Sequence, residues 1–296
     1  MPVSCSRSIP EEAAIGTLYI VATPIGNLED ISLRALRLLR EARLIAAEDT
    51  RHTRRLLTRY EIATPTISYH EHNKLVRRDT ILAALAEGDV ALVSDAGTPA
   101  INDPGYELVV AAIEAGYTVS PVPGPSAPIA ALVASGLPTA QWTYLGFLPH
   151  RRTERLSFLQ QYAALPTTLL CFETPHRLRA ALADLQAVLG DRRICVAREL
   201  TKLHEEFVRG SIGDAIVHFE THAPRGEFVL VIEGATAPPV EESLAAGEWQ
   251  ERARSRLHEL AAQGVAGSAA AKQVAKELGV ARSEVYALWV ALSDEG

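Results

Sequence analysis

A loop of small, turn-forming and acidic residues, Ser94-Asp95-Ala96-Gly97-Thr98-Pro99-Ala100-Ile101-Asn102-Asp103-Pro104-Gly105, follows the apolar run Val90-Ala91-Leu92-Val93. The apolar run predicts a buried strand, and the loop begins where that strand ends. Proteins of the α/β class bind ligands at the carboxyl ends of their parallel strands. The stretch therefore predicts a ligand site at one edge of a sheet.

Two further segments have the same pattern of a strand followed by a Pro/Gly bend. Thr17–Ala22 leads into Thr23-Pro24-Ile25-Gly26-Asn27, and Thr118–Ser120 leads into Pro121-Val122-Pro123-Gly124-Pro125-Ser126. Carboxyl ends of parallel strands meet at one edge of a sheet. The three bends are therefore predicted to wall a single small-molecule cleft.

Short apolar segments alternate with helical patterns between Thr17 and Val122, which predicts a mostly parallel sheet covered on both faces. The expected strands are Leu18–Ala22, Arg43–Ala47, Thr66–Tyr69, Val90–Ser94 and Thr118–Val122, and the expected helices are Ser32–Glu41, Thr50–Arg59, Lys74–Glu87 and Asp103–Ala115. The Pro121–Pro125 run is expected to continue neither a strand nor a helix, so it marks the predicted end of this lobe.

A second α/β lobe is expected after this boundary. Its predicted helices are Ala127–Ser135, Thr153–Tyr162, Pro175–Leu189 and Ile212–Phe219, and its predicted strands are Trp142–Phe147, Thr167–Phe172, Ile194–Glu199, Phe207–Arg209 and Glu227–Glu233. Hairpin-like runs of strands allow some antiparallel pairing here. The expected division is a flexible tail (1–14), an N-terminal α/β lobe (15–121), a C-terminal α/β lobe (122–236) and a helical extension (237–296), with a linker at Ala235–Pro239.

Composition limits the cellular setting. The three cysteines, Cys5, Cys171 and Cys195, form no CxxC motif, which argues against a disulfide framework and a structural zinc site and fits a reducing cytoplasm. No apolar run approaches the roughly 18 residues of a membrane span. The first fourteen residues lack the apolar core of a secretory signal. We expect a cytoplasmic protein with no membrane partner.

Arginines gather in one part of an acidic chain. The net charge is −7, yet residues 34–78 hold eleven Lys/Arg against five Asp/Glu. The arginines recur at helical spacing, as Arg34, Arg37 and Arg40 and as Arg51, Arg54, Arg55 and Arg59. Such stripes can contact the phosphates of a nucleic acid, and a solvated helical face is the alternative. The candidate platforms for stacking bases are Tyr60, Tyr69 and Trp142, with a buried core position as the alternative.

Two other patterns carry weaker indications. Ser268–Leu278, a turn at Gly279 and Ser283–Leu292 match a helix-turn-helix. Residues 237–296 hold nine acidic and six basic side chains, so a packing or RNA-orienting module is favoured over DNA reading. His70-Glu71-His72 places two imidazoles at a strand end, but no further Cys/His cluster has ligand spacing, so RNA contact or exposure is favoured over a metal site.

Six segments together are more specific than any one of them. They are Val21–Asp30, Ala47–Arg51, Ser94–Gly105, Pro123–Ser126, Phe172–Arg177 and Arg198–Lys202. In this order they resemble the RsmI family of ribosomal RNA methyltransferases, within the tetrapyrrole-methylase superfamily of S-adenosylmethionine enzymes. The resemblance covers roughly residues 15–235 and implies a two-lobed α/β class III methyltransferase fold with a C-terminal helical extension. It also implies methylation of a cytidine ribose 2′-hydroxyl in the decoding region of 16S rRNA.

The same resemblance implies a set of cofactor contacts. They fall on Pro24, Ile25, Gly26, Asp95, Ala96, Gly97, Thr98, Ile101, Ser126, Ala127, Phe172, Glu173 and Leu200. Ile25 stands where tetrapyrrole methylases carry a proline and Thr98 where they carry an aspartate, and Asp95 is the candidate to replace that aspartate. Small residues let backbone groups approach S-adenosylmethionine. Neither GxGxxG nor GxxxxGK occurs, so dinucleotide and P-loop sites find no support.

A ribose hydroxyl is a weak nucleophile, so a nearby base or cation should assist it. The candidates are Glu48, Asp49, Arg51, Arg198, Glu199 and Lys202. A carboxylate would take the proton, and Arg or Lys would stabilise a phosphate or the developing alkoxide. Arg198 with Glu199, and Asp49 with Arg51, can also be structural ion pairs. His176-Arg177 is expected to grip a phosphate or the other lobe.

These observations predict a methyltransferase that binds S-adenosylmethionine between its lobes, and the family resemblance implies a homodimer that methylates 16S rRNA of the 30S ribosomal subunit. Glu199→Gln and Lys202→Ala should then lower turnover more than cofactor affinity. Two alternatives stay open. A methylase of a tetrapyrrole or other small molecule would not need the arginine stripes. A nonenzymatic nucleic-acid adaptor would use the C-terminal helices and bind no S-adenosylmethionine.

Overall fold

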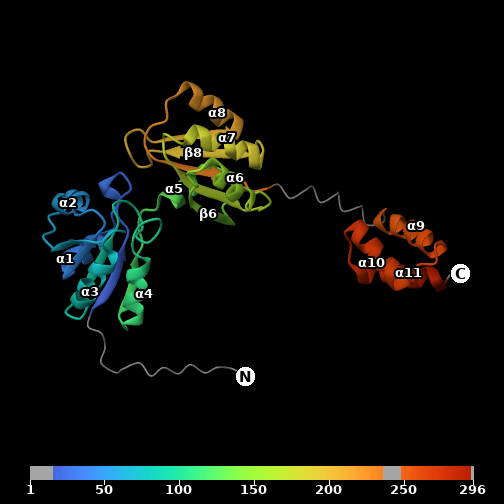
Figure 1. Ribbon diagram of the computed structural model, residues 1–296, viewed down its shortest axis with the longest axis horizontal. Coiled ribbons are helices and arrows are strands. Elements are labelled where there is room, and N and C mark those ends of the chain that lie inside the picture. Colours follow the sequence, from blue (N-terminus) through green and yellow to red (C-terminus); the bar gives the residue numbers. More distant parts are fainter. Residues whose placement is uncertain (1–15, 236–247, 295–296) are drawn as a thin grey trace. The chain divides into compact units, whose positions relative to one another are not determined.

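The computed structural model describes residues 16–235 and 248–294. The chain divides after Ala235 into two compact units (Figure 1), and each is described by itself. The expected tail (1–14) and most of the expected linker lie outside the described residues. Among the described residues, none of the helices has the length and apolar character needed to cross a membrane.

All strands of the first sheet run parallel, in the order β3-β2-β4-β1-β5, as the alternation of strands and helices predicts. The strands are β1 (Thr17–Val21), β2 (Leu44–Ala47), β3 (Thr66–Ser68), β4 (Val90–Val93) and β5 (Thr118–Val122). The central strand β4 is buried along its whole length, because helices cover both faces of the sheet.

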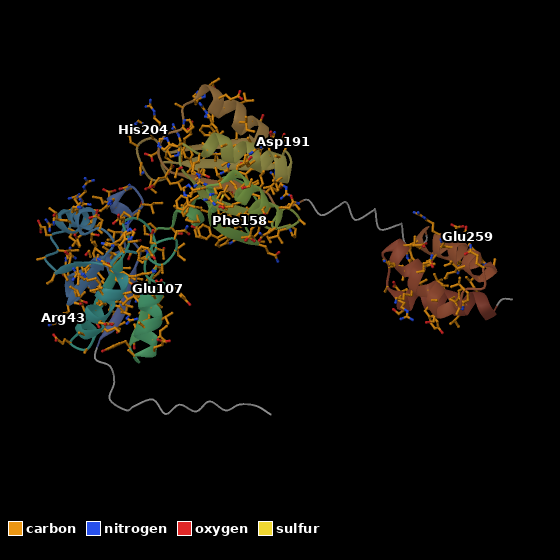
Figure 2. All side chains as sticks on the ribbon, viewed as in Figure 1. Arg43, Glu107, Phe158, Asp191, His204 and Glu259 are labelled. Carbon is orange, nitrogen blue, oxygen red and sulfur yellow. The ribbon has the colours of Figure 1, made fainter. Side chains whose placement is uncertain are left out.

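Alternate strand residues serve the two faces of this sheet. The covering helices are α1 (Leu33–Glu41), α2 (Thr50–Arg59), α3 (Lys74–Leu85) and α4 (Tyr106–Glu114). Ala91 packs with α1 and α2 in one core, whereas Leu92 packs with α3 and α4 in the other. Successive strand residues point to opposite faces, which explains the division. Glu107 of α4, labelled in Figure 2, forms an ion pair with Lys74 of α3.

The second sheet is mixed, in the order β6-β7-β10-β8-β9. Its strands are β6 (Trp142–Phe147), β7 (Thr168–Glu173), β8 (Arg193–Arg198), β9 (Glu206–Ser211) and β10 (Phe228–Ile232). β6 pairs parallel with β7 and all other pairs are antiparallel, which confirms the antiparallel pairing that the hairpin-like runs allow. The helices on one face are α6 (Arg152–Gln160), α7 (Leu178–Leu189) and α8 (Ile212–Thr221), and α5 (Ala127–Ser135) covers the other.

The described part of the second unit consists of helices around their own core. They are α9 (Glu248–Ala262), α10 (Gly267–Leu278) and α11 (Arg282–Asp294). α10 ends at Gly279 in the left-handed region, which confirms the predicted turn between two helices. A Cβ on Gly267 would lie 2.1 Å from Nε1 of Trp289, so α10 and α11 approach closely at this point.

Two predicted helices begin later than expected, and both changes lengthen a loop. The helix predicted from Asp103 begins at Tyr106, and the one predicted from Pro175 begins at Leu178. Both stretches contain a proline, which lacks the N–H of a helical hydrogen bond, and the regular helix begins two residues after Pro104 and three after Pro175. The residues before each helix therefore lie in loops at the sheet edge, where they can contribute side chains.

Three other predictions are wrong in detail. The strand predicted to reach Glu199 ends at Arg198, because Glu199 has a left-handed φ of 50°. Pro121, expected to break the chain, lies within β5. β5 is an edge strand, and an edge tolerates a residue without an N–H. Tyr69, a candidate for base stacking, is only 1% exposed and belongs to the core beneath α3 and α4.

Candidate active site

A cavity of about 280 Å³ lies at the strand ends of both sheets of the first unit. The first sheet contributes Ile25 after β1, Glu48 after β2, Asp95–Thr98 and Ile101–Asp103 after β4, and Ser126–Pro128 after β5. The second sheet contributes Phe147, Phe172–Thr174, Glu199, Leu200, Lys202 and Glu227–Val229. β10 runs against β7 and β8, so its amino end meets their carboxyl ends at the cavity.

The three Pro/Gly bends of the first sheet lie together, as the sequence predicts. The backbones of Thr23 and Gly97 exchange two hydrogen bonds, of 2.8 and 3.0 Å. The hydroxyl of Thr98 donates to the carbonyl of Pro125 at 3.3 Å. Gly97 has a φ of 84°, a conformation that glycine adopts without strain. The bends after β1, β4 and β5 therefore form one continuous wall.

Carboxylates dominate the charged lining of the cavity. Glu48 accepts a hydrogen bond from the N–H of Asp95 at 3.3 Å, and Asp95 accepts one from the N–H of Asp49 at 3.0 Å. Burial, followed by repulsion from Glu48, raises the pKa of Asp103 to about 6. Burial also raises the pKa of Glu48. A wall of this kind favours a cationic ligand and repels phosphate.

The loop after β8 closes the cavity from the second sheet. Nζ of Lys202 donates to Oε1 of Glu199 at 2.9 Å, and this hydrogen bond lowers the pKa of Glu199. Thr201 has a left-handed φ of 64°, unusual for a β-branched residue, and its Oγ1 accepts the N–H of Asn27 at 3.0 Å. The loop is thus joined to the bend after β1. Glu199 is held as a carboxylate by its cation, which makes it a weak proton acceptor near neutral pH.

Most of the predicted site residues come together at this cavity. Those that line it are Ile25, Glu48, Asp95, Ala96, Gly97, Thr98, Ile101, Ser126, Ala127, Phe172, Glu173, Glu199, Leu200 and Lys202. The predicted residues that are not part of this lining are Pro24, Gly26, Asp49, Arg51 and Arg198.

Asp49, Arg51 and Arg198 have structural partners instead. Asp49 caps α2 by accepting the N–H of Arg51 at 2.8 Å, and its other oxygen lies 2.7 Å from Nη2 of Arg51. These contacts hold the pKa of Asp49 well below its usual range. Arg198 pairs with Glu206 on the neighbouring strand β9 at 2.5 Å, not with Glu199. The geometry supports the ion-pair interpretation for these residues.

Gly26 has a spacing function that the sequence did not indicate. A Cβ on this residue would lie 2.5 Å from Cγ of Lys202 and 2.7 Å from Oγ1 of Thr201. Contacts this short are not compatible with a side chain unless the loop moves. Gly26 therefore allows the loop after β8 to lie against the bend after β1.

Several lining residues were not predicted. They are Asn102, Asp103, Pro128, Phe147, Thr174, Glu227, Phe228 and Val229. Asn102 and Asp103 belong to the quoted loop after β4, so their position in that loop was an available signal. Residues 227–229 gave none, because their placement depends on the antiparallel direction of β10.

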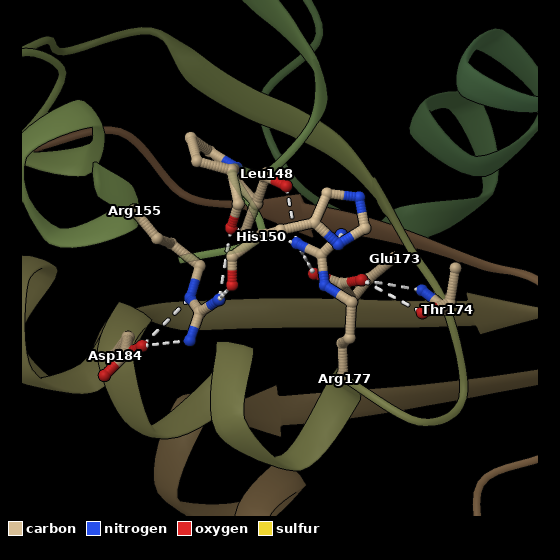
Figure 3. A network of polar contacts seen from close by, with 8 residues as sticks. Leu148, His150, Arg155, Glu173, Thr174, Arg177 and Asp184 are labelled. Atoms are coloured by element: carbon tan, nitrogen blue, oxygen red, sulfur yellow. Dashed lines mark hydrogen bonds and ion pairs between the residues drawn. The ribbon is translucent and has the colours of Figure 1, made fainter. Parts of the chain in front are cut away.

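A polar network supports the wall at Glu173 (Figure 3). Oε1 of Glu173 accepts the N–H of Thr174 at 2.8 Å, and Oε2 lies 3.3 Å from Nη2 of Arg177. Arg177 also donates to the carbonyls of Leu148 and Pro149, at 2.5 and 3.1 Å. Arg177 therefore holds a loop of its own lobe, and the prediction that it grips the other lobe is wrong.

The other histidine and aromatic candidates do not line the cavity. Nε2 of His70 lies 3.1 Å from the side-chain nitrogen of Asn73. Within residues 16–235 and 248–294, no group of three or more His, Cys, Asp or Glu side chains is arranged to hold a metal ion. Tyr60 donates its hydroxyl to the carbonyl of Leu28 at 2.7 Å. Trp142 is 41% exposed but stands at the opposite end of β6 from Phe147.

Comparison with known proteins identifies the family. Residues 17–216 match the model of the Tetrapyrrole (Corrin/Porphyrin) Methylases. Ribosomal RNA small subunit methyltransferase I of Synechocystis sp. is 48% identical over 284 residues, which cover 95% of this chain and 100% of that protein. The protein of the same name from Thermotoga maritima is 48% identical over 221 residues, covering 99% of its length and 74% of this chain. The family therefore includes a member that matches only about three quarters of this chain.

A solved structure supports the fold. The uroporphyrin-III C-methyl transferase of Thermus thermophilus, complexed with S-adenosylhomocysteine, aligns with a TM-score of 0.51 and 20% identity over 73% of this chain and 97% of that one. The cavity described above has an acidic lining and small, glycine-bearing loops, which suit a cationic ligand. The chain belongs to the tetrapyrrole methylases and, within them, to the ribosomal RNA small subunit methyltransferase I (RsmI) family of S-adenosylmethionine-dependent enzymes.

Proposed function

We propose that this protein transfers a methyl group from S-adenosylmethionine to the ribose 2′-hydroxyl of a cytidine in the decoding region of 16S rRNA. It acts in the cytoplasm, as a homodimer, on the small ribosomal subunit. The names of the relatives support a small-subunit rRNA substrate. The observation that carries the proposal is a separation of charge: the cavity lining has six carboxylates and one cation, Lys202, whereas exposed arginines stand on α1 and α2.

This separation suits a donor cation inside and an RNA backbone outside. α2 begins two residues after Glu48, so its arginines follow directly on a lining residue. Arg54, Arg55 and Arg59 are exposed on this helix and are available to phosphates. The carboxylates of the cavity would repel those phosphates. A nucleotide would therefore present its sugar and base, not its phosphate, to the cavity.

The residues of the cavity have distinct roles in this proposal. Gly97, Ser126 and Ala127 leave room for backbone groups to approach the donor. S-adenosylmethionine supplies an electrophilic methyl group on a sulfonium, which the ribose oxygen takes as it gives up its proton. Asp103 accepts that proton, because its pKa of about 6 makes it a carboxylate at neutral pH and still a useful base. Lys202, held by Glu199, stabilises negative charge that develops on the ribose oxygen.

The test is direct mapping of 2′-O-methylation. Purified protein is incubated with 30S subunits that lack the modification, and the methylated nucleotide is located by primer extension at low nucleotide concentration. We expect the reverse transcriptase to stop at one new position, a cytidine in the decoding region. Methylation of a base, of a different RNA region, or of no RNA at all would refute the proposal.

The two alternatives make opposite predictions in the same assay. A tetrapyrrole or other small-molecule methylase would transfer methyl to a free small molecule and be indifferent to the arginines of α2. A nonenzymatic adaptor would bind RNA without binding the donor, which family membership already argues against. Sedimentation of the free protein tests the homodimer separately.

A further inference from the structure

The edge strand β6 ends in a bulge beside the cavity. Tyr144 pairs with Leu170 and Phe147 pairs with Phe172, so β6 advances by one residue more than β7. In a regular strand, residues three apart point to opposite faces. The extra residue cancels this alternation, and both Tyr144 and Phe147 contact the ring of Phe172, at centroid distances of 5.8 and 5.2 Å. Bulges next to active sites commonly redirect a side chain in this way.

The bulge fits closely against the loop after β4. Gly146, within the bulge, has a left-handed φ of 66°, and a Cβ there would lie 3.1 Å from Nδ2 of Asn102. Oδ1 of Asn102 accepts the hydroxyl of Tyr144 at 2.7 Å, and Asn102 itself has a φ of 64°. Both residues adopt the left-handed region, Gly146 without strain and Asn102 as one of the few other residue types that tolerate it. The hydrogen bond to Tyr144 therefore holds the bulge against the loop after β4.

Phe147 remains half exposed in spite of this construction. The residue is 49% exposed and lines the cavity, next to Phe172. A phenylalanine that is simply structural gains stability by being buried. An aromatic ring that is aimed at a cavity and left open to solvent offers its face to a planar ligand.

The chain immediately after Phe147 is held firmly. Arg177 donates to the carbonyls of Leu148 and Pro149, and Arg155 donates to those of Pro149 and His150, at 3.1 and 3.2 Å (Figure 3). Arg155 is also paired with Asp184, and both side chains are at most 5% exposed. The cost of burying these two charges is offset by their pairing and by the hydrogen bonds from Arg155 to the backbone, which also hold the loop after Phe147 in place.

We propose that Phe147 is the stacking platform for an unstacked nucleobase of the acceptor RNA. The inference rests on the proposed function and adds a binding subsite to it. The cavity carboxylates repel phosphate, so the part of a nucleotide that reaches this wall is its base and sugar. RNA enzymes and binding proteins hold splayed bases by stacking them on aromatic side chains. Because a phenyl ring has no hydrogen-bonding group, it orients the base without choosing among bases.

The test compares Phe147→Ala, Phe147→Leu and Phe147→Tyr with Trp142→Ala. Trp142 lies on the same strand and is 41% exposed, but it does not line the cavity, which makes it a matched control. We expect kcat/KM for methyl transfer to 30S subunits to fall roughly 5- to 150-fold in Phe147→Ala, the range found when a stacked base loses its aromatic partner. Phe147→Leu, which keeps apolar volume without a ring, should fall similarly. Phe147→Tyr and Trp142→Ala should stay near wild type.

A binding measurement separates this inference from the proposed function. A short decoding-region RNA with pyrrolocytidine at the acceptor position is titrated with protein in the presence of S-adenosylhomocysteine, since stacking quenches this fluorophore. We expect quenching by wild type and Phe147→Tyr and its loss in Phe147→Ala, whether or not methyl transfer takes place. Calorimetric affinity for S-adenosylhomocysteine should be unchanged in all variants, and Phe147→Ala and Phe147→Leu should remain folded at the assay temperature although they lose the ring contact with Phe172.

Three outcomes would refute the inference that Phe147 is a stacking platform. A fall in S-adenosylhomocysteine affinity matching the fall in kcat/KM would assign Phe147 to the donor's adenine. Equal effects of Phe147→Ala and Trp142→Ala would show a general surface effect. Full activity and quenching in Phe147→Leu would show that apolar volume suffices. Failure of the proposed function has a different signature, namely wild-type protein that methylates no rRNA.

Discussion

Asp103 is the residue whose chemistry depends most on its surroundings. It was expected inside a helix, and instead it lies in a loop, where burial and then repulsion from Glu48 and Asp95 raise its pKa to about 6. A carboxyl group in this range changes charge close to neutral pH. If Asp103 is the proton acceptor of the proposed function, its ionisation would affect both activity and stability as the pH changes.

Asp103→Asn tests both effects. Because the proton acceptor is the carboxylate, kcat/KM of the wild type should rise with pH up to about 6 and then level off. The variant should lose this rise in kcat/KM together with most of its rate. The raised pKa means that ionised Asp103 destabilises the fold, so the variant should be more stable than wild type above pH 6 and equal to it near pH 4. The gain in the free energy of unfolding should be about 1 kcal/mol, because the partial exposure of Asp103 weakens the effect. A variant with an unchanged pH profile would remove Asp103 from the mechanism.

A substitution at Gly26 tests whether the loop after β8 must lie against the bend after β1. Gly26→Ala should force apart the loop at Thr201 and Lys202, because the new Cβ would lie within 2.7 Å of both residues. We expect the free energy of unfolding to fall by about 1–3 kcal/mol and kcat to fall by a larger factor than the donor affinity. Gly88→Ala is the matched control, since its Cβ would meet Arg43 only at ordinary contact distance, 3.5 Å. Equal losses of stability and kcat in Gly26→Ala and Gly88→Ala would contradict this role of Gly26.

At the scale of elements, helix α2 joins the acidic cavity to a basic surface. Asp49 caps its first turn, and its buried side packs Leu56 and Leu57 into the first-sheet core. Its other side is left with exposed arginines, as the helical spacing of the sequence predicts. One short helix therefore connects the chemistry of the cavity to the contact expected for RNA.

Arg54→Ala with Arg55→Ala should weaken binding of 30S subunits while leaving donor affinity unchanged. Each lost phosphate contact lowers the slope of log affinity against log salt by about 0.7–0.9, so the double variant should lose roughly 1.5 in slope. Arg43→Ala is the control, because Arg43 stands at the start of β2, the edge of the sheet opposite the cavity, paired with Glu87. An unaltered salt dependence in the double variant would favour a small-molecule substrate.

At the scale of the whole molecule, the chain consists of a two-sheet unit and a helical unit that is built around its own core. All lining residues of the cavity belong to the first unit. The Thermotoga relative covers only 74% of this chain at 99% of its own length. The first unit therefore supplies the whole described lining of the cavity.

A chain ending at Ala235 should fold and bind S-adenosylhomocysteine with unchanged affinity. Its kcat/KM for 30S subunits is the informative quantity, since an RNA-orienting role of the helices would lower it while a purely packing role would not. Calorimetry and the rRNA methylation assay measure the two quantities separately. Loss of donor binding in the shortened chain would show that the site needs the second unit.

The amino-acid sequence by itself determined the order of strands and helices, the parallel first sheet, the meeting of three Pro/Gly bends and the family. These follow from local pattern, because hydrophobic periodicity and turn residues act over a few positions. Only the tertiary structure decided that Phe147 faces the cavity, that Gly26 makes space for Thr201, and that Asp103 has a raised pKa. Each of these depends on strand register, loop packing or burial by residues distant in sequence, and no local pattern records such contacts.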